Sequence, residues 1–230
     1  MKIPMSSRLL ACCSFVHPGD RVADIGCDHG YLGIYLLTNG IAASTIEADI
    51  NPQPLDSARK NGRKFQVEQA MTFCLCDGAR DIPRDFDSMV CAGMGADTII
   101  SILEGAPWLQ DSRYRLILQC QSKRPELRRW LCRRGYAIAR ETLARDGKFL
   151  YTVMEVRWAP GQVLTPAQTY LSPQLLADNH PLLPQFYDRV LGGLTKTVEG
   201  LRRSGGEQLA QFEEILSDLE KLEGKIHGNG

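Results

Sequence analysis

Three glycines and two acids fall close together in this chain, directly after a short apolar run. They lie in the stretch Asp24-Ile-Gly-Cys-Asp-His-Gly-Tyr-Leu-Gly33. Glycine lets the backbone turn tightly and approach a ligand where a Cβ would intrude, and a helix that follows such a turn offers unpaired N–H groups to an anion. The pattern therefore predicts a strand, a ligand-binding turn and a helix in succession.

The acids in this stretch restrict the ligand that it could bind. A dinucleotide fingerprint has the spacing Gly-x-Gly-x-x-Gly, but the residue two positions after Gly26 is Asp28, whose charge would face a pyrophosphate. S-adenosylmethionine instead carries an ammonium group and a sulfonium centre, which Asp24 at the strand end and Asp28 in the loop would attract. The pattern favours S-adenosylmethionine over NAD, and a glycine-bearing turn without a function is the alternative.

Acids after two later apolar runs fit the same ligand. Asp49 lies about twenty residues beyond the glycine turn, where an acid can accept both ribose hydroxyls. Glu47 is a nearby rival, but alternation along a strand would point it to another face. Asp77 follows the third run and precedes Gly78, a position suited to the adenine amino group. A solvated loop acid is the alternative at each position.

Small residues end the fourth apolar run, in the stretch Val90-Cys-Ala-Gly-Met-Gly-Ala96. Such residues leave room for a methyl acceptor beside the sulfonium. No Asn-Pro-Pro-Tyr or Asp-Pro-Pro-Tyr signature occurs there, although enzymes that methylate an exocyclic amine commonly use this clamp. The stretch therefore favours a different acceptor atom, and a plain turn is the alternative.

The elements that must position these residues alternate as in an α/β protein. Apolar runs separated by helix-like stretches are typical of βαβ units. The predicted strands are Arg21–Ile25, Ser44–Ala48, Met71–Leu75, Ser88–Ala92 and Arg115–Gln119, and the predicted helices are Tyr31–Asn39, Pro54–Arg63, Asp97–Glu104 and Pro125–Arg134. Because right-handed crossovers make such strands parallel, their carboxyl ends should meet at one edge of the sheet.

An amphipathic segment, Ser6 to Val16, precedes these units, and an antiparallel pattern follows them. Two further strands, Tyr136–Leu143 and Phe149–Trp158, flank the turn-forming pair Asp146-Gly147. An antiparallel pair that closes a parallel sheet is the seven-stranded architecture of the class I methyltransferases that use S-adenosylmethionine. We therefore expect a Rossmann-like α/β domain over residues 1–159.

Residues 160–230 are predicted to form a proline-bearing linker and a helical hairpin. Apolar residues recur at helical spacing in two stripes, which are separated by Ser204-Gly-Gly206. The stripes are Leu191, Leu194, Val198 and Leu201, and then Leu209, Phe212, Leu216 and Leu219. This pattern predicts an antiparallel, coiled-coil-like pair of α-helices. Packing, dimerisation and substrate docking all remain open as its role, and no oligomeric partner is predicted.

Composition sets the class of the protein. With 230 residues, 43% hydrophobic and 23% charged, the chain can bury one good core and a small appendage. No basic segment with an apolar run opens the chain, and no uncharged apolar stretch reaches about 18 residues, which favours a cytoplasmic protein without a membrane span. The eight cysteines form no Cys-x-x-Cys pair, so reduced, buried thiols are expected rather than a metal site.

Charge is distributed unevenly along the chain, although the formal net charge is zero. Residues 113–148 hold eleven Lys and Arg against three acids, a formal charge of +8, so the remainder sums to −8. Such a segment can bind phosphates by releasing counterions, and a solvated helix face is the alternative. The candidate nucleic-acid contacts in it are Lys123, Arg124, Arg128 and Arg129.

Four motifs resemble the bacterial tRNA (adenine-22-N1) methyltransferases, the TrmK family. They are Asp24-Ile-Gly-Cys-Asp-His-Gly-Tyr-Leu32, Ala92-Gly-Met-Gly95, Leu116-Ile-Leu-Gln119 and Asp146-Gly-Lys148. The likeness runs in order and spacing from about Ser6 to Val156. It implies methyl transfer from S-adenosylmethionine to N1 of adenine 22, with tRNA as the partner, no metal, and a helical hairpin after the domain.

The resemblance also implies roles for individual residues. The candidate cofactor-binding residues are Asp24, Gly26, Cys27, Asp28, His29, Asp49, Ile50, Asp77, Gly78, Ala92, Gly93 and Met94. Arg8 would face the substrate phosphate. Asp28 is the candidate catalytic residue, because a carboxylate would stabilise the adenine ring as it becomes cationic; binding the cofactor's ammonium group is its alternative role.

The chain departs from the family at two places that border the expected acceptor pocket. Ala96 stands where the family usually has Gly, and Cys120-Gln121 stands where it usually has Pro-Asn. These departures keep two alternatives open: a methyltransferase acting on another RNA base, a small molecule or a protein, and a non-catalytic protein that binds S-adenosylmethionine and RNA.

Overall fold

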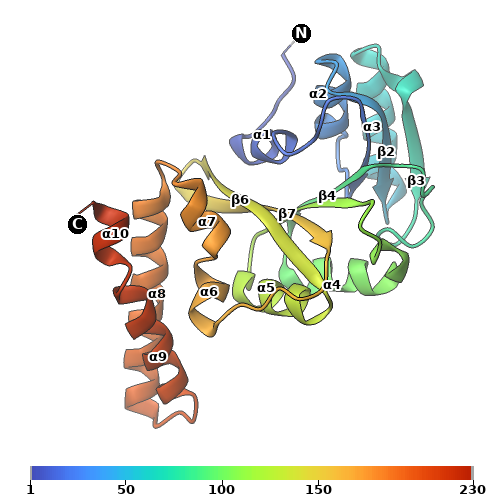
Figure 1. The fold of residues 1–230 in the computed structure, drawn as a ribbon. Helices are drawn as coiled ribbons and strands as arrows, with labels where there is room; N and C mark the ends of the chain where they lie inside the picture. Colours follow the sequence, from blue (N-terminus) through green and yellow to red (C-terminus); the bar gives the residue numbers. More distant parts are fainter. Residues whose placement is uncertain (1, 229–230) are drawn as a thin grey trace. The chain divides into compact units, whose positions relative to one another are not determined.

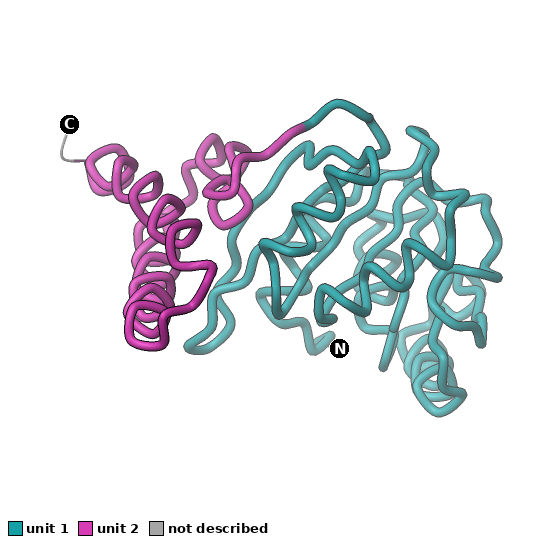
Figure 2. Tube along the Cα trace, turned by 90° about the horizontal axis from the view of Figure 1, so that it is seen from below, with its two compact units in different colours: residues 1–162 teal, residues 163–230 magenta. Residues whose placement is uncertain are grey.

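The computed structural model describes residues 2–228, which divide into two compact units after Gln162 (Figure 2). The Gln162 amide belongs to the first unit by its hydrogen bonds. It accepts from the Ile138 N–H at 2.7 Å and donates to the Ile138 carbonyl at 3.2 Å. Those two bonds hold the chain against the first unit up to this residue, a little beyond the predicted end at residue 159.

The first unit is built on one seven-stranded sheet. Its strands are β1 (Asp20–Ile25), β2 (Ala42–Asp49), β3 (Met71–Leu75), β4 (Ser88–Met94), β5 (Arg115–Cys120), β6 (Tyr136–Asp146) and β7 (Phe149–Trp158). They lie in the order β3-β2-β1-β4-β5-β7-β6 (Figure 1). Six strands run in the same direction, and β7 runs antiparallel to them. The predicted fold class, with its antiparallel final hairpin, is confirmed.

Five α-helices pack around this sheet: α1 (Ser7–Cys13), α2 (Tyr31–Thr38), α3 (Pro52–Lys64), α4 (Ala96–Gly105) and α5 (Arg124–Arg133). Two 3₁₀ turns, η1 (Glu68–Ala70) and η2 (Pro107–Leu109), complete the unit. All predicted strands and helices are present, with ends displaced by no more than three residues. One displacement matters for the site, because β2 extends to include Asp49 as its last residue.

The core explains why the apolar runs form strands. Met89, Val90 and Cys91 of β4 are fully buried, as are Leu116 to Leu118 of β5. Helix α1 contributes Cys12, which is also fully buried. Burial of a large apolar side chain contributes roughly 1.5–3 kcal/mol, so the central strands hold most of the packing energy and give the strand ends a fixed position.

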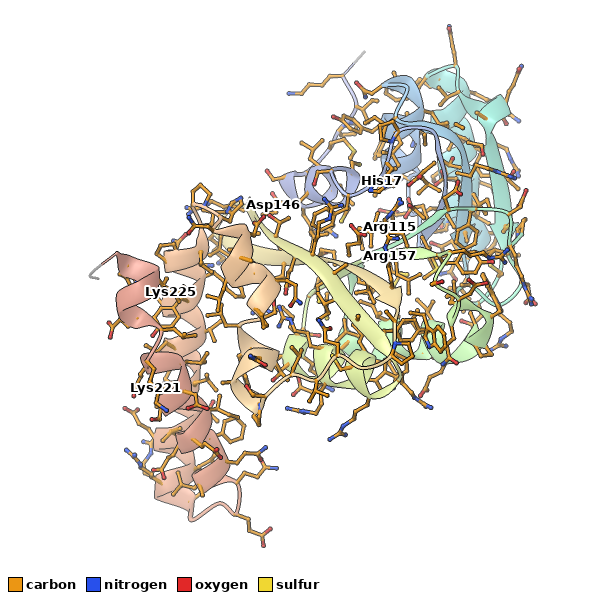
Figure 3. All side chains as sticks on the ribbon, viewed as in Figure 1. His17, Arg115, Asp146, Arg157, Lys221 and Lys225 are labelled. Atoms are coloured by element: carbon orange, nitrogen blue, oxygen red, sulfur yellow. The ribbon has the colours of Figure 1, made fainter. Side chains whose placement is uncertain are left out.

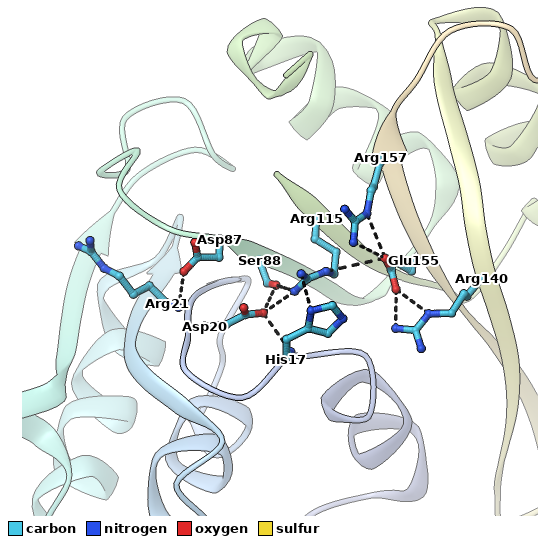
Figure 4. A network of polar contacts seen from close by, with 9 residues as sticks. All are labelled: His17, Asp20, Arg21, Asp87, Ser88, Arg115, Arg140, Glu155 and Arg157. Carbon is cyan, nitrogen blue, oxygen red and sulfur yellow. Dashed lines mark hydrogen bonds and ion pairs between the residues drawn. The ribbon is translucent and has the colours of Figure 1, made fainter. Parts of the chain in front are cut away.

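A polar network fastens the amino ends of the strands, at the edge opposite the glycine turn (Figure 4). Asp20, which begins β1, accepts hydrogen bonds from Ser88 Oγ at 2.5 Å and from Arg115 Nη1 at 2.5 Å. Arg115 also lies 3.7 Å from Glu155 of β7. Three strand ends are thereby joined to the antiparallel hairpin. His17, Arg140 and Arg157 also belong to the network, and Figure 4 draws the neighbouring hydrogen bond from the Arg21 N–H to Asp87 at 2.8 Å.

The β6–β7 hairpin projects past the carboxyl end of β5. Strand β7 pairs with β5 only from Leu116↔Val156 to Leu118↔Met154. Its pairing with β6 continues to Asp146↔Phe149, next to the turn, and Figure 3 labels Asp146 there. The residues near the turn are therefore backed by the hairpin itself and extend toward the edge of the sheet that carries the glycine turn.

The second unit is helical throughout. Its helices are α6 (Pro166–Tyr170), α7 (Pro173–Asp178), α8 (Leu183–Ser204), α9 (Leu209–Glu220) and α10 (Glu223–His227). Two short helices, α6 and α7, lie within the stretch that was predicted as a proline-bearing linker. Each begins with a proline directly after a capping hydroxyl, from Thr165 and Ser172, and both features favour a helix start.

Helices α8 and α9 form the predicted hairpin. Helix α8 continues through Gly192 and Gly193, and Gly205 ends it in a left-handed conformation with φ of +68°. The buried Tyr187 hydroxyl of α8 donates to the Leu219 carbonyl of α9 at 3.0 Å. Among residues 2–228, no helix has both the length and the apolar composition that a bilayer span requires.

Candidate functional site

Two adjacent hollows lie at the carboxyl edge of the parallel strands, with cavity volumes of about 300 Å³ and about 280 Å³. Gly26 and Met94 border both of them. Gly26 has φ of +74°, and a Cβ on it would lie 2.4 Å from Met94 Cε. The Met94 side chain therefore packs against the glycine turn where the two hollows meet, and the left-handed φ favours glycine at position 26.

The twelve predicted cofactor-binding residues all line these hollows. Asp24, Gly26, Cys27, Asp28, His29, Ala92, Gly93 and Met94 border the first hollow, and Asp49, Ile50, Asp77 and Gly78 border the second. The structure adds Leu9, Tyr31, Leu32 and Gln121 to the first, and Ile25, Ala48, Cys76, Thr98 and Ile102 to the second. Most of the added residues are apolar, so no chemical pattern in the sequence could single them out.

Asp24 supplies a buried carboxyl group to the first hollow. It is 5% exposed, and burial, followed by the charges of Asp49 and Asp28, raises its pKa to about 7. No ion pair to Asp24 occurs within residues 2–228. A buried acid without a countercharge beside an open hollow is well suited to a ligand that carries an ammonium group.

Glu47 is the register partner of Asp24 on β2, and it does not line either hollow. Its side chain is fully buried and reaches toward Gly33 of helix α2. Burial, followed by the charge of Asp24, raises the pKa of Glu47 well above its ordinary value. The predicted choice of Asp49 over Glu47 for the ligand site agrees with this geometry.

Asp49 and Asp77 occupy the second hollow from two neighbouring strands. Asp49 Oδ1 accepts the Asn51 N–H at 2.9 Å, which orients the carboxylate at the tip of β2. Asp77 lies 3.8 Å from Arg80 and its side chain is 66% exposed. Gly78 follows with φ of +64°, and a Cβ there would lie 3.0 Å from Ile102 Cγ1. The glycine keeps this wall of the hollow open beside the acid.

The loop between β1 and α2 places Asp28 at the mouth of the first hollow. Asp28 has φ of +51°, a left-handed conformation that is uncommon for a residue other than glycine. The Gly30 N–H donates to the Cys27 carbonyl at 2.8 Å, and the His29 carbonyl accepts from Asn61 at 2.9 Å. These bonds hold the turn, and the Asp28 carboxylate lies 3.6 Å from His29 Nε2.

The surroundings of Cys27 disfavour the thiolate that a nucleophilic cysteine requires. Burial, followed by the charge of Asp24, raises the pKa of the Cys27 thiol, so the thiol stays protonated. All eight cysteines are free thiols.

Gln119 holds Arg8 and the Gly93 backbone at the wall of the first hollow. Its amide is fully buried, and Oε1 accepts from the Gly93 N–H at 2.9 Å and from Arg8 Nη1 at 2.8 Å. A Cβ on Gly93 would lie 2.9 Å from Arg8 Nη1. Gln119 was predicted only as part of a family motif, without a role of its own, although an amide near the end of a mostly apolar strand was the available signal. Arg8 is thus held at the wall of the hollow, which leaves its contact with a substrate phosphate a prediction.

The predicted phosphate contact by Arg128 was wrong. Arg128 and Glu141 are both fully buried and form an ion pair with each other, because this face of α5 packs against β6. Lys123 is exposed and pairs with Asp97 at 2.7 Å, while Arg124 is half-buried, which lowers its pKa. Arg129 is partly exposed on α5. Periodicity in the sequence could not show that one of these four basic candidates is in the core.

Ion pairs also neutralise much of the +8 segment. Arg115, Arg134 and Arg140 pair with Asp20, Glu104 and Glu155, which all lie outside this segment. The excess of positive charge along the sequence is therefore larger than the excess on the surface.

Comparison with known proteins places these features in a family. A family model described as a methyltransferase domain matches residues 5–154. The tRNA (adenine(22)-N(1))-methyltransferase of Bacillus subtilis is 32% identical over 149 residues, which are 64% of this chain and 63% of that protein. The chain thus matches just under two thirds of the length of that relative.

Two further relatives match over a larger part of their length. A protein of Mycoplasma pneumoniae described as a candidate tRNA methyltransferase is 32% identical over 180 residues, which are 75% of this chain and 81% of that protein. A Streptococcus pneumoniae protein described as a candidate tRNA (m1A22) methyltransferase, solved in complex with S-adenosyl-L-methionine, superposes with a TM-score of 0.79 at 27% identity, covering 92% of this chain and 99% of that one. The chain belongs to the methyltransferase-domain family and, within it, to the tRNA methyltransferases, as its motifs predicted.

Proposed function

We propose that this protein transfers the methyl group of S-adenosylmethionine to N1 of an adenine in tRNA, at position 22. The observation that carries the proposal is the pair of hollows in which Asp24, Asp49 and Asp77 lie at three strand ends. Each acid matches one polar part of that cofactor: an ammonium group, a pair of ribose hydroxyls and an adenine amino group. Membership of the family supports the same substrate class.

The proposed binding mode follows from the two hollows. Asp24 in the first would hold the ammonium end, and Asp49 and Asp77 in the second would hold the nucleoside end. Bound in this way, the cofactor supplies an electrophilic methyl group on its sulfonium. Met94 borders both hollows, and its unbranched, flexible side chain can move to let one ligand occupy both.

Methyl transfer to adenine depends on alignment of the reacting atoms more than on a general base. Adenine N1 carries an in-plane lone pair, so it attacks without prior deprotonation. Holding the reacting atoms about 3–3.5 Å apart can supply roughly 7–11 kcal/mol of barrier reduction. Ala92 and Gly93 leave space at the first hollow, and Gln119 fixes the Gly93 backbone. The chain's contribution is thus a rigid, small-residue wall against which the base is placed.

Asp28 is proposed as the group that stabilises the ring as it becomes cationic. Its carboxylate borders the first hollow, but its side chain is 75% exposed, so solvent weakens its field. Asp28→Asn separates its two possible roles. A lower kcat at unchanged cofactor affinity supports contact with the base, whereas weaker cofactor binding supports contact with the ammonium group.

Binding of tRNA completes the proposal. N1 lies on the pairing edge of adenine, so the target base must leave its helix at a cost of a few kcal/mol. Arg8, Lys123, Arg124 and Arg129 are the predicted phosphate contacts that remain after Arg128 is withdrawn. Because tRNA is the proposed substrate, we infer that the protein works in the cytoplasm.

Label transfer from methyl-labelled S-adenosylmethionine to a tRNA transcript tests the function. We expect label in 1-methyladenosine at position 22, and none in a transcript with guanine at that position. Label at another base, or transfer to protein or small molecules, would support the alternatives that the Gln121 departure leaves open. Binding of both ligands without any transfer would support a non-catalytic protein.

Calorimetry of Asp49→Ala tests the cofactor site independently of the acceptor. Loss of charge-assisted hydrogen bonds is worth about 1.5–3 kcal/mol, so affinity should fall roughly 10- to 150-fold. Asp85→Ala is the matched control, because Asp85 is a 60% exposed acid that pairs with Arg21 away from the hollows. Equal affinities of the two variants would refute the assigned cofactor site.

A further inference from the structure

Two aromatic side chains on the projecting part of the β6–β7 hairpin lie between two basic ones, of which Arg8 comes from helix α1 and Lys148 from the hairpin turn. The Arg8 guanidinium lies 6.0 Å from the centre of the Tyr151 ring, and the Tyr151 and Phe149 rings are 6.2 Å apart with an angle of 43° between their planes. Lys148 Nζ lies 5.4 Å from the centre of the Phe149 ring. We call these four residues, Arg8, Tyr151, Phe149 and Lys148, the hairpin track.

The hairpin track begins at the methyl-transfer site. Arg8 lines the first hollow and is held there by Gln119. Phe149 and Tyr151 are two residues apart on β7, so they lie on the same face of the strand, while Leu150 between them is buried on the other. Both precede the part of β7 that pairs with β5. The track therefore leads from the first hollow toward the turn of the hairpin.

The outer aromatic residue of the track, Phe149, is not part of the hydrophobic core. Phe149 is 54% exposed, one of the few large apolar side chains of this chain that face solvent to that degree. An exposed phenylalanine adds little to folding, yet it offers an open aromatic face at the end of the track. Tyr151 is partly exposed beside it.

The charges around the track favour a polyanion. Arg8 and Lys148 lie near its two rings, one at each end of the track. Asp146, in register with Phe149, is the acid of the turn. Aromatic faces combined with cations are the arrangement that binds unpaired nucleotides, since every base has a face to stack and a phosphate to pair.

We propose that the hairpin track binds unpaired nucleotides adjacent to the target base, with bases stacked on Phe149 and Tyr151 and phosphates held by Lys148 and Arg8. The inference rests on the proposed function and extends it. Taking the target base out of its helix unstacks its neighbours, and the track offers those neighbours new stacking partners next to the first hollow. It thereby offsets part of the cost of opening the base.

The chain contains a matched control for this arrangement. Phe65, at the end of helix α3, has Lys64 Nζ 6.0 Å from the centre of its ring. Helix α3 begins after the carboxyl end of β2, so its last residues lie at the opposite edge of the sheet from the hollows. Phe65→Ala removes the same pairing of a lysine and a phenylalanine where no substrate is proposed.

Affinity for a target stem-loop RNA tests the proposal. Stacking on an aromatic residue is worth about 1–3 kcal/mol per base, so Phe149→Ala and Tyr151→Ala should each weaken RNA binding roughly 5- to 150-fold. Phe149→Trp should retain the affinity, and Phe65→Ala should not change it. Cofactor affinity should be the same in all of them, because Phe149 and Tyr151 line neither hollow.

A second measurement identifies the stacked nucleotides. Abasic substitutions are placed one at a time beside the target adenine, and each RNA is bound to wild-type protein and to Phe149→Ala. If Phe149 stacks on one of those bases, the two losses are not additive at that nucleotide, whereas additive losses at every position overturn the hairpin track. Wild-type protein that binds no tRNA and transfers no methyl group to it would instead refute the proposed function.

Discussion

A Cβ on Gly33 would lie 2.0 Å from Oε1 of Glu47. Helix α2 crosses strand β2 at this point, and the glycine gives the space that the buried carboxyl group fills. We expect Gly33→Ala to lower the free energy of unfolding by about 1–3 kcal/mol, because overpacking forces either the helix or the carboxyl group to move. Urea denaturation measures the change.

Gly192→Ala is the control for that substitution. Gly192 lies within helix α8, with nothing within 4 Å of the position of a Cβ, so alanine there should be neutral or stabilise by up to about 1 kcal/mol. A double-mutant cycle with Glu47→Ala identifies the cause. Strictly additive effects of Gly33→Ala and Glu47→Ala would show that the two side chains do not compete for space.

The raised pKa of Asp24 makes the stability of the ligand-free protein depend on pH. In the unfolded chain Asp24 ionises near its ordinary pKa of about 4, whereas in the folded protein it holds its proton up to a pKa of about 7. Its contribution to stability is therefore fully present below about pH 4 and is lost as the pH rises through about 7. Asp24→Asn should flatten the fall in melting temperature across this range, and an unchanged profile would contradict the assignment.

The same ionisation should control cofactor affinity. An ammonium ligand prefers the carboxylate, so below pH 7 binding must release the Asp24 proton. Affinity should then fall by up to about tenfold for each pH unit below 7 and level off above it. Calorimetry at several pH values in wild-type protein and in Asp24→Asn measures the dependence, which should be absent in the variant, where the overall affinity is also lower.

Arg128 and Arg129 are neighbours in sequence, but we expect replacement of Arg128 to lower stability and replacement of Arg129 to leave stability nearly unchanged. Arg128→Ala leaves the Glu141 charge buried, which typically costs about 3–5 kcal/mol of stability. Arg129→Ala, at a partly exposed position, should change stability by less than about 0.5 kcal/mol and, if Arg129 contacts tRNA, should reduce the salt dependence of binding. A stable Arg128→Ala protein with weakened RNA binding would restore the surface role that its burial excludes.

Asp20→Asn tests whether the polar network at the amino edge of the sheet affects ligand binding at the carboxyl edge. Asp20 accepts from Ser88 and Arg115 at the amino ends of the strands, so removing its charge should lower stability by about 1.5–3 kcal/mol. Cofactor affinity should stay unchanged, because this network shares no residue with either hollow. Reduced affinity in a fully folded variant would show that the two edges are coupled.

The sequence was sufficient for the fold and for the cofactor side of the site because both depend on local patterns. Strand alternation and the glycine turn placed Asp24, Asp49 and Asp77 at strand ends, and those ends meet wherever strands are parallel. Arg128 could not be placed in the same way. Whether an arginine in a basic helix is exposed or buried depends on Glu141 of β6, a contact that no local pattern records.

The contacts of Gln119 and Glu47 could not be predicted for a similar reason. Each side chain depends on a partner on another element: Arg8 for Gln119 and Gly33 for Glu47. Helices α6 and α7 were not predicted within the proline-bearing stretch, although each begins with a proline after a capping hydroxyl.

The Gln162 amide also protects the sheet from other chains. Strand β6 lies at the edge of the sheet, where unpaired N–H and C=O groups can recruit a strand from another molecule. Gln162 occupies both the N–H and the C=O of Ile138, so part of that edge cannot template intermolecular pairing. Gln162, at the end of the first unit, thus also reduces the tendency of this edge to aggregate.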